Sequence, residues 1–580
     1  MKGYLHQKQL YFGPPNTTIF NFMKSFLMLF LLFCAAMLQA QSEPFGFQLP
    51  ASAIDQIPVS ELATFNHDQL LLEDTRLEKA GGRTNIGRIV PINLNEQSAG
   101  SWSVLSNGDR VWQYRFRSAG AKGMCMYFDG LYIPQGAVMF LYSTDRKTFV
   151  GPFSQDDCNA HGSFMMGEVL GDDAVLEYYE PASVVGVPSI GIQSVSHMYR
   201  YVYNYSDYSS DDASRIDESD ACEVDVNCPE GADWIPQRDA VVRLLITDGG
   251  FQGLCSGSVV NTTARDCRLY ILTALHCGIG VSDAEWLQCS VRFKYQKSGC
   301  GTGNASTISN RVGVFHLADS NDGGGQSGSD FLLLELEDNV PSSYNVFYAG
   351  WDARTTTPQD VVGIHHPAGD AKKISTATNI TSGTYSAPGN HWRVVWMATE
   401  TNHGVTEGGS SGSPIFNQNK RIVGQLTGGA SFCTSPTAPD FYGKMDKNWD
   451  DNPNTAAQKL KEWLDPLDTG ELFIDGSYAD GSNSTQPCSP LSVSENQLSF
   501  ASIQLYPSLV DYELTIRASD YEKIAEYRVF NAQGVWITSS LVKSDRETID
   551  CSNWSAGVYF ITFIGQEGDH ITQKFVVEHK

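Results

Sequence analysis

The chain has 580 residues, too many for a single hydrophobic core, and this length predicts about three or four domains of roughly 100–200 residues each. Its 66 acidic and 40 basic residues give a formal net charge of −26. This charge argues against nucleic acid as a partner, because the phosphate backbone would be repelled, and it is typical of a soluble extracellular surface.

The N-terminal region carries an export signal. A polar and basic start at residues 23–25 leads into the apolar run 26–37, and a small-residue cleavage site ends at Ala40. We therefore interpret residues 1–40 as a signal peptide, for which Met23 is a second candidate start. The apolar run is too short for a stop-transfer helix, and no other segment approaches about 18 uninterrupted apolar residues. We expect no integral membrane segment in the mature protein.

The thirteen cysteines of this exported chain predict disulfides rather than metal ligands, because export ends in an oxidising compartment. No Cys-x-x-Cys pair or His-x-x-x-His cluster favours zinc. We therefore expect neither a metal nor a cofactor.

Residues 41–215 are predicted to form a β-rich domain that ends in an acidic linker. Short alternating runs, such as 111–116 and 137–142, are separated by turn residues and indicate strands. Cys125 and Cys158 are candidates for one disulfide. Residues 203–221 are rich in Tyr, Ser and Asp and have too little apolar surface for a core, which predicts an exposed linker.

Residues 216–476 contain many short apolar runs bounded by Gly and Asn, which predicts a second all-β domain. Apolar residues between 456 and 464 have helical spacing, so we expect this domain to close with a helix. Residues 477–498 are rich in Ser, Asn, Pro and Gly and are interpreted as a linker. Residues 499–580 alternate again and predict a last β domain.

Three residues of the middle domain are candidates for chemistry. His276 follows the apolar strand 269–273, Asp330 opens another apolar run, and Ser411 lies in the glycine-rich turn 408–414. A serine hydroxyl is a weak nucleophile unless an imidazole takes its proton, and the imidazole needs a carboxylate to fix its tautomer. The order His, Asp, Ser along the chain is that of chymotrypsin.

The turn around Ser411 also suits the stabilisation of an oxyanion. Gly409 and Gly412 allow a tight turn in which the amides of Gly409 and Ser411 point at the developing charge. Loss of one such donor costs about 3 kcal/mol of barrier. A lone histidine after a strand is usually a structural core residue and a Gly-Ser run is usually a loop, but the ordered combination favours a catalytic site.

The middle domain resembles the lysyl endopeptidases, which are bacterial serine proteases of the trypsin and chymotrypsin fold. The matching segments are 222–231, 272–278, 330–336, 349–352, 365–367, 404–407, 409–414, 440–443 and 463–466. The resemblance implies a double Greek-key β-barrel and an endopeptidase that acts on proteins and peptides through an acyl-enzyme. It assigns His276 as the general base, Asp330 as its orienting acid and Ser411 as the nucleophile.

The resemblance also implies three disulfides, namely Cys222–Cys433, Cys228–Cys300 and Cys255–Cys277. Cys267 and Cys289 depart from the family pattern, and we predict that they pair with each other. His365 and His366 match a histidine pair that the family keeps in a structural loop, so we do not assign them to a metal.

Specificity is expected to depend on Asp440, which the resemblance places at the bottom of the S1 pocket. A buried carboxylate there demands a cationic side chain. Thr427 stands where the family has a histidine, and Tyr385 is the candidate for the tryptophan that stacks on it. These departures weaken the preference for Lys, so we expect Arg to be accepted as well.

The mature enzyme is expected to arise by cleavage between Arg215 and Ile216, because Arg215 is the basic residue of the acidic linker. Autocatalysis at this site would require that arginine is accepted. Ser410 stands where trypsin has the aspartate of its activation switch. Latency is therefore attributed to coverage of the site by residues 41–215.

The last domain resembles the C-terminal sorting domain that the type IX secretion system reads. The matching segments are 505–508, 514–516, 529–534, 557–560 and 573–575. The resemblance implies secretion machinery as a partner, and a protein that is secreted or held on the outer surface of a Gram-negative bacterium. The alternative is a plain accessory β-sandwich.

Two other functions remain open. A glutamate-specific protease of the same fold would need a polar, uncharged pocket with a cationic or histidine contribution in place of Asp440. A surface-displayed binding protein on an inert protease scaffold is disfavoured by the intact His276, Asp330 and Ser411. We expect a monomer in either case.

Overall fold

A computed structural model describes residues 43–79, 82–159, 161–200, 219–303, 305, 309–451 and 458–479, and, with short gaps, 503–579. The predicted signal peptide, the Arg215–Ile216 site and most of both predicted linkers lie outside the described residues. Among the residues that it describes, no helix is long and apolar enough to cross a membrane.

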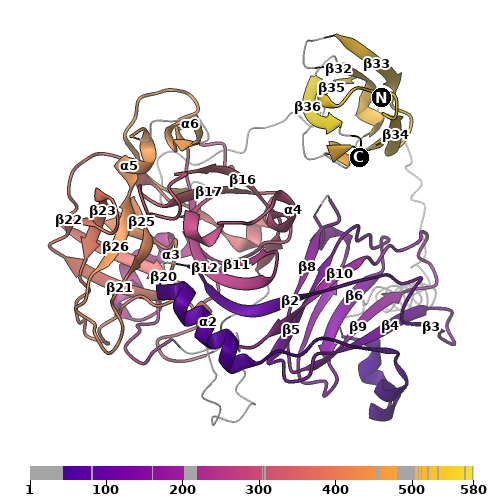
Figure 1. Cartoon of the computed structure of the whole chain (residues 1–580), viewed down its shortest axis with the longest axis horizontal. Helices are drawn as coiled ribbons and strands as arrows, with labels where there is room; N and C mark the ends of the chain where they lie inside the picture. Colours follow the sequence, from indigo (N-terminus) through magenta and orange to yellow (C-terminus); the bar gives the residue numbers. More distant parts are fainter. Residues whose placement is uncertain are drawn as a thin grey trace, which may run out of the picture.

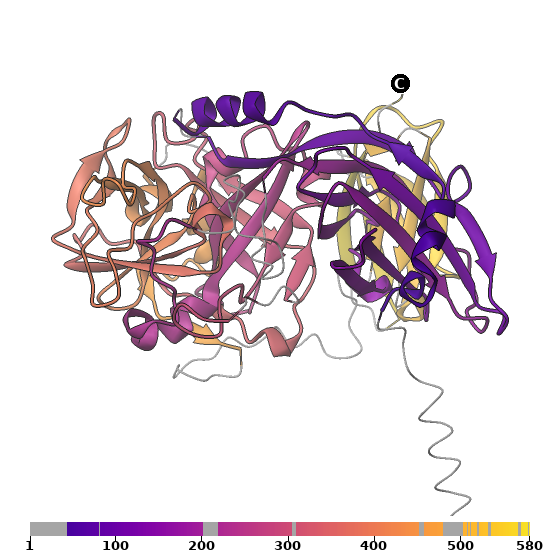
Figure 2. The ribbon, with the colours of Figure 1, turned by 90° about the horizontal axis from the view of Figure 1, so that it is seen from below.

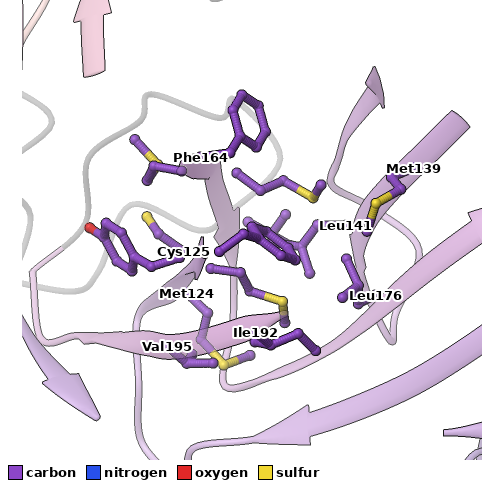
Figure 3. Packing of buried hydrophobic residues seen from close by; sticks show 14 of the residues in the cluster. Met124, Cys125, Met139, Leu141, Phe164, Leu176, Ile192 and Val195 are labelled. Atoms are coloured by element: carbon purple, nitrogen blue, oxygen red, sulfur yellow. The ribbon is translucent and has the colours of Figure 1, made fainter. Parts of the chain in front are cut away.

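The N-terminal region forms two sheets that face each other across one core (Figures 1 and 3). The first contains β1 (Val59–Glu61), β4 (Arg110–Arg117), β9 (Asp173–Glu180), β6 (Val138–Ser143) and β7 (Phe149–Phe153), with β3 (Ser101–Val104) beside β4. The second contains β2 (Thr84–Leu94), β10 (Ile192–Met198), β5 (Gly123–Phe128) and β8 (Phe164–Leu170). Helix α2 (His67–Lys79) precedes β2.

The suggested disulfide between Cys125 and Cys158 is wrong, because both thiols are free and buried. The Cys125 thiol accepts a hydrogen bond from Gln252 Nε2 at 3.2 Å, whereas the Cys158 thiol contacts Ser154 O at 3.5 Å. Each sulfur therefore has its own local partner.

The middle region contains two further sheets. The first has the order β15 (Asn310–Val312), β14 (Ser290–Arg292), β11 (Val241–Asp248), β12 (Phe251–Val260), β13 (Tyr270–Ala274), β17 (Phe331–Leu336) and β16 (Val314–Asp319). The second has the order β21 (Lys373–Thr378), β20 (Asp360–His365), β24 (Pro414–Asn417), β25 (Ile422–Gly429), β26 (Asp440–Lys444), β23 (Pro388–Val394) and β22 (Thr381–Thr384). The predicted all-β, two-barrel architecture is confirmed.

Short segments complete this region. They are α3 (Ile235–Ala240), α4 (Asp283–Trp286), α5 (Met445–Trp449), α6 (Lys461–Leu464), β18 (Phe347–Tyr348), β19 (Trp351–Asp352), β27 (Phe473–Ile474) and β28 (Ser477–Tyr478). The described part of the expected closing helix is α6, and residues 452–457 lie outside the description. Leu460 and Leu464 are buried there in the core shared with Trp449.

The N-terminal region is not separated from the middle region by a break in the sheet. Strand β2 also pairs with β12, so that one continuous sheet runs from β8 to β15 (Figures 1 and 2). In both views the indigo strand β2 extends from its own sheet to the magenta strands of the middle region.

The structure contains the three disulfides that the resemblance implies, Cys222–Cys433, Cys228–Cys300 and Cys255–Cys277. The predicted Cys267–Cys289 pair is wrong. Cys267 is disulfide-bonded, whereas Cys289 has a free thiol that is fully buried in the core around β11 and β13. Apolar packing, rather than a bond, accounts for the burial of Cys289.

The C-terminal region consists of two sheets that enclose a separate core. One contains β29 (Ile503–Tyr506), β31 (Glu513–Ala518) and β34 (Arg546–Asp550). The other contains β30 (Leu509–Val510), β36 (His570–Val577), β35 (Gly557–Gly565), β32 (Ile524–Asn531) and β33 (Trp536–Leu541).

Candidate active site

Strand pairing brings His276 and Asp330 together. Strand β13 ends just before His276 and β17 begins just after Asp330, and the two strands pair antiparallel. The ring of His276 donates from Nδ1 to Asp330 Oδ2 at 2.7 Å, and the backbone N–H of His276 donates to Oδ1 at 2.9 Å. One carboxylate therefore fixes both the ring and the backbone of the histidine.

A second carboxylate, which the sequence did not single out, holds the loop before Asp330. Asp322 accepts the N–H of Asp330 on Oδ2 and the N–H of Gly325 on Oδ1, both at 2.8 Å. Asp330 itself has a φ of 63°, an uncommon conformation for a residue with a side chain. The contacts from Asp322 stabilise this conformation and so orient the Asp330 carboxylate.

Asp330 is completely buried. Burial raises the pKa of Asp330, and the charge and hydrogen bonds of His276 oppose that rise. The contacts with His276 thus partly offset the cost of burying this carboxylate away from water.

The turn that carries Ser411 lies directly against the strands that lead to His276. Ser256 of β12 donates its N–H to Ser411 O at 2.8 Å. Gly412 has a φ of 80°, and a Cβ at this position would lie 2.1 Å from Thr273 Oγ1 and 2.8 Å from Ala274 N. Only glycine permits this approach, which places the serine turn of the second barrel against β13 of the first.

The amides of this turn divide into two groups. The N–H groups of Ser410, Gly412 and Ser413 donate to backbone carbonyls at 2.8–3.0 Å. Those of Gly409 and Ser411 have no acceptor among the residues that the structure describes. These are the two amides that the sequence singled out for an oxyanion site, and they are available to an outside acceptor.

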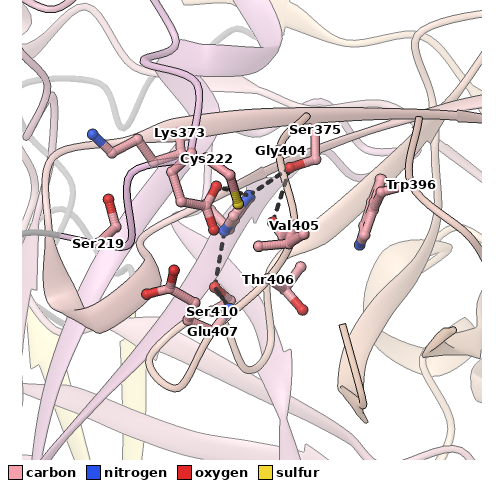
Figure 4. Close-up of polar contacts among 12 residues, drawn as sticks. Ser219, Cys222, Lys373, Ser375, Trp396, Gly404, Val405, Thr406, Glu407 and Ser410 are labelled. Carbon is pink, nitrogen blue, oxygen red and sulfur yellow. Dashed lines mark hydrogen bonds and ion pairs between the residues drawn. The ribbon is translucent and has the colours of Figure 1, made fainter. Parts of the chain in front are cut away.

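Ser410 is held by a buried histidine (Figure 4). Its hydroxyl lies 2.8 Å from His365 Nδ1, and His365 Nε2 lies 3.2 Å from Ser375 Oγ. Because Ser375 donates its hydroxyl to Val405 O at 2.9 Å, His365 donates from Nε2 and accepts from Ser410 at Nδ1. Burial lowers the pKa of His365 to about 3, so the ring is neutral and the residue before Ser411 is fixed without a charge.

His366, the neighbour of His365, is also buried and its Nδ1 lies 2.9 Å from Asp370 O. The Nδ1 atoms of both rings are thus engaged in protein contacts.

Asp440 lies at the start of β26 and is 1% exposed. Its Oδ2 accepts hydrogen bonds from Ser431 Oγ at 2.6 Å, Thr406 Oγ1 at 2.7 Å and Trp396 Nε1 at 2.6 Å. Burial raises the pKa of Asp440, which these hydrogen bonds oppose. Within the described ranges no cationic side chain pairs with this carboxylate. The three donors were missed in the sequence because they come from separate loops.

A histidine that the sequence did not single out joins Thr427 and Tyr385. His391 Nε2 lies 3.1 Å from Thr427 Oγ1, and the ring centroids of His391 and Tyr385 are 5.7 Å apart. An imidazole and an aromatic ring are therefore present at this corner although residue 427 is a threonine. Thr427 also lies close to Gly325 of the loop that Asp322 holds.

Residues 216–443 match the family described as lysyl endopeptidase, C-terminal domain. Residues 504–578 match the family described as secretion system C-terminal sorting domain. Both predicted resemblances are thereby confirmed, and the second match also confirms the predicted place of the protein outside the cell or on its outer surface.

A lysyl endopeptidase of Pseudomonas aeruginosa is 31% identical over 322 residues, which represent 53% of this chain and 65% of that protein. The chain thus spans just under two thirds of the curated relative that it matches. Among solved structures, a Glu endopeptidase is 18% identical with a TM-score of 0.25, and the match covers 36% of this chain and 85% of the endopeptidase chain. The protease Anisep of Arthrobacter nicotinovorans is 15% identical with a TM-score of 0.28, and the match covers 38% of this chain and 95% of the Anisep chain.

Proposed function

We propose that the protein is a secreted serine endopeptidase that cleaves proteins and peptides after basic residues. The proposal rests on the His276–Asp330 hydrogen bond of 2.7 Å, which adjoins a serine turn with two amides that have no acceptor among the described residues. This arrangement contains a nucleophile, a base with a fixed tautomer and donors for a developing oxyanion.

The reaction begins when Ser411 Oγ attacks the carbonyl carbon of the substrate and His276 Nε2 takes the hydroxyl proton. Asp330 holds the Nδ1–H and stabilises the imidazolium that forms. The carbonyl oxygen becomes an oxyanion that accepts hydrogen bonds from the N–H groups of Gly409 and Ser411. His276 then gives its proton to the leaving amine, which departs and leaves an acyl-enzyme on Ser411.

Water completes the cycle by the same route. His276 takes a proton from the water as the water attacks the acyl carbon, and returns a proton to Ser411 Oγ when the acid product leaves. Each proton that His276 removes is thus returned to a leaving atom, and the enzyme ends unchanged.

The preference for a basic residue before the scissile bond is attributed to Asp440. A buried carboxylate that accepts from neutral donors on both oxygens and has no paired cation among the described residues keeps its charge uncompensated, which favours the arrival of a lysine or arginine side chain. The same carboxylate disfavours a glutamate-specific enzyme, because two like charges would meet in one desolvated pocket.

Residues 41–215 are assigned as a propeptide, residues 216–476 as the protease domain, 477–498 as a linker and 499–580 as the domain that engages the secretion machinery. Pairing of β2 with β12 supports the first assignment, since it puts the propeptide beside the serine turn. Release at Arg215–Ile216 agrees with a protease that accepts arginine.

The proposal is tested with three fluorogenic peptides that differ only in Lys, Arg or Glu before the scissile bond. We expect cleavage of the Lys and Arg peptides, no cleavage of the Glu peptide and no activity in the Ser411→Ala variant. Labelling of Ser411 by an organophosphorus reagent separates an active enzyme from an inert binding protein. Cleavage of the Glu peptide alone, or an unlabelled Ser411, would contradict the proposal.

A further inference from the structure

One propeptide strand runs along β12 toward the candidate active site. Leu254 pairs with Thr84, Gly253 with Asn85, Gln252 with Gly87 and Phe251 with Arg88. The next residues of β12 are Cys255, which is bonded to the neighbour of His276, and Ser256, which donates to Ser411 O. The N-terminal end of β2 is therefore the end nearest to the catalytic residues.

The same end of β2 contacts the serine turn. A Cβ on Gly408 would lie 2.1 Å from Thr84 Oγ1, and Gly408 precedes the unsatisfied amide of Gly409. From Thr84 onward the strand leads away from Ser411. A substrate that added to β12 in this direction would place on β12 the residues that follow its scissile bond.

Arg83, just before the paired residues, is held by the protease domain. Its guanidinium forms an ion pair with Asp248 and donates from Nη1 to Cys277 O at 3.0 Å. Gly253 leaves room for the arginine, since a Cβ there would lie 2.5 Å from Arg83 Nε. The Arg83 side chain is 6% exposed and that of Asp248 32% exposed.

Asp248 has no other cationic partner among the residues that the structure describes, so removal of the propeptide would leave its carboxylate unpaired. Burial raises the pKa of Asp248, and the charge of Arg83 opposes that rise. Asp248 also accepts a hydrogen bond from the N–H of Phe251, which keeps the carboxylate in place at the hairpin between β11 and β12. The site is therefore built by the protease domain and only filled by the propeptide.

We propose that Asp248 and the carbonyl of Cys277 form a subsite for a basic side chain at the first position after the scissile bond. Arg83 occupies this subsite in the precursor. The inference rests on the proposed endopeptidase function and adds a second specificity determinant on the leaving-group side of the cleft.

The same geometry explains why this segment blocks the cleft rather than being cut there. Gly82 precedes Arg83 and has no side chain that could fill the Asp440 pocket. The segment therefore makes leaving-group contacts without the contact that aligns a scissile bond. A substrate with a basic residue on both sides of the bond satisfies Asp440 and Asp248 together.

The test compares peptides with lysine before the scissile bond and Arg, Ala or Glu after it, using the active enzyme that is obtained when the expressed full chain has released residues 41–215. We expect kcat/KM to be about 10-fold higher for Arg than for Ala, as one charged hydrogen bond provides, and lower still for Glu. In the Asp248→Asn variant the Arg and Ala peptides should be cleaved with equal kcat/KM. Asp283→Asn, which removes an exposed charge from the neighbouring helix α4, should leave the roughly 10-fold ratio intact.

The outcomes separate the two proposals. Equal kcat/KM for the Arg and Ala peptides in the unmodified protein would overturn the subsite but not the endopeptidase. A preference for Arg that persists in Asp248→Asn would also overturn it. Failure to cleave any of the peptides would overturn the proposed function and this inference with it.

Discussion

The carboxylate of Asp330 holds His276 at two points, the ring Nδ1 at 2.7 Å and the backbone N–H at 2.9 Å. This double contact fixes the tautomer of the ring and its position relative to β13 with one residue. Substitutions of Asp330 and of residues around it therefore separate the orientation of His276 from the effect of the negative charge beside it.

Asp330→Asn keeps the size of the side chain but removes the charge that stabilises the imidazolium. We expect kcat to fall by about 10⁴ with little change in KM, because the wrong tautomer of His276 then faces Ser411. Initial rates on a lysine peptide measure this. A near-normal kcat in Asp330→Asn would contradict the assigned role.

Asp322→Asn tests the loop behind Asp330. The asparagine keeps one acceptor oxygen and loses the other, so one of the two N–H contacts, to Asp330 or to Gly325, is lost. We expect a smaller fall in kcat of about 10- to 100-fold, because geometry is loosened while the charge of Asp330 remains. Gln326→Ala, on an exposed residue of the same loop, serves as the control and should retain full activity.

Asp440→Asn is expected to lower kcat/KM for both Lys and Arg peptides by about 10³-fold or more, since the cation then enters a buried pocket without a counter-charge. Thr406→Ser keeps the hydroxyl that donates to Oδ2 and should retain the specificity. The measurement is kcat/KM, in each variant, for a set of peptides that carry each amino acid in turn before the scissile bond. Undiminished cleavage after lysine in Asp440→Asn would show that the pocket lies elsewhere.

The candidate catalytic residues could be picked out because each adjoins a strand with a clear apolar pattern. His276 ends one such strand, Asp330 begins another and Ser411 precedes a third, so the sequence placed them correctly relative to the strands. Their partners were not predictable in the same way. Asp322 acts from within a loop, and His391 reaches Thr427 from a strand that is adjacent only in the folded barrel.

The two errors in cysteine pairing have one physical cause. Both pairs were chosen from cysteines left over in the sequence, and that choice does not test whether two cysteines come within bonding distance. Cys125 and Cys289 instead pack as free thiols in two different apolar cores. The continuous sheet was also not predictable from the sequence, because it depends on the pairing of β2 with β12, two segments that are far apart in the chain.

Glu407, which adjoins the serine turn, gives a prediction for pH. Burial raises its pKa to about 7, the N–H of Asp220 and the charge of Lys373 oppose the rise, and the charges of Asp220 and Asp370 add to it. The folded state thus favours the protonated form, so this group stabilises the fold fully below about pH 4.5 and loses that contribution as the pH rises through about 7.

The loss amounts to about 3 kcal/mol between pH 4.5 and 8, as an order of magnitude. Urea denaturation of the Ser411→Ala chain at about pH 5 and about pH 8 measures it, and Glu407→Gln should reduce the difference between the two pH values by that amount. Glu400→Gln, on the exposed nearby loop, should leave the difference as it is. An unchanged difference in Glu407→Gln would contradict the predicted titration.

Arg83→Ala tests the proposal that Arg83 helps to hold β2 against the protease domain. The change removes the ion pair with Asp248 and the hydrogen bond to Cys277 O while leaving the backbone pairing of β2 with β12 in place. In a Ser411→Ala background, which prevents self-cleavage, we expect the amides at the start of β2 to exchange with solvent about 10-fold faster, because local opening no longer breaks a buried charged contact. Arg88→Ala is the matched control, since Arg88 lies at the far end of the pairing over the ring of Phe251. It should leave exchange at Thr84 and Asn85 unchanged, and equal exchange in the two variants would argue that backbone pairing alone keeps the strand in the cleft.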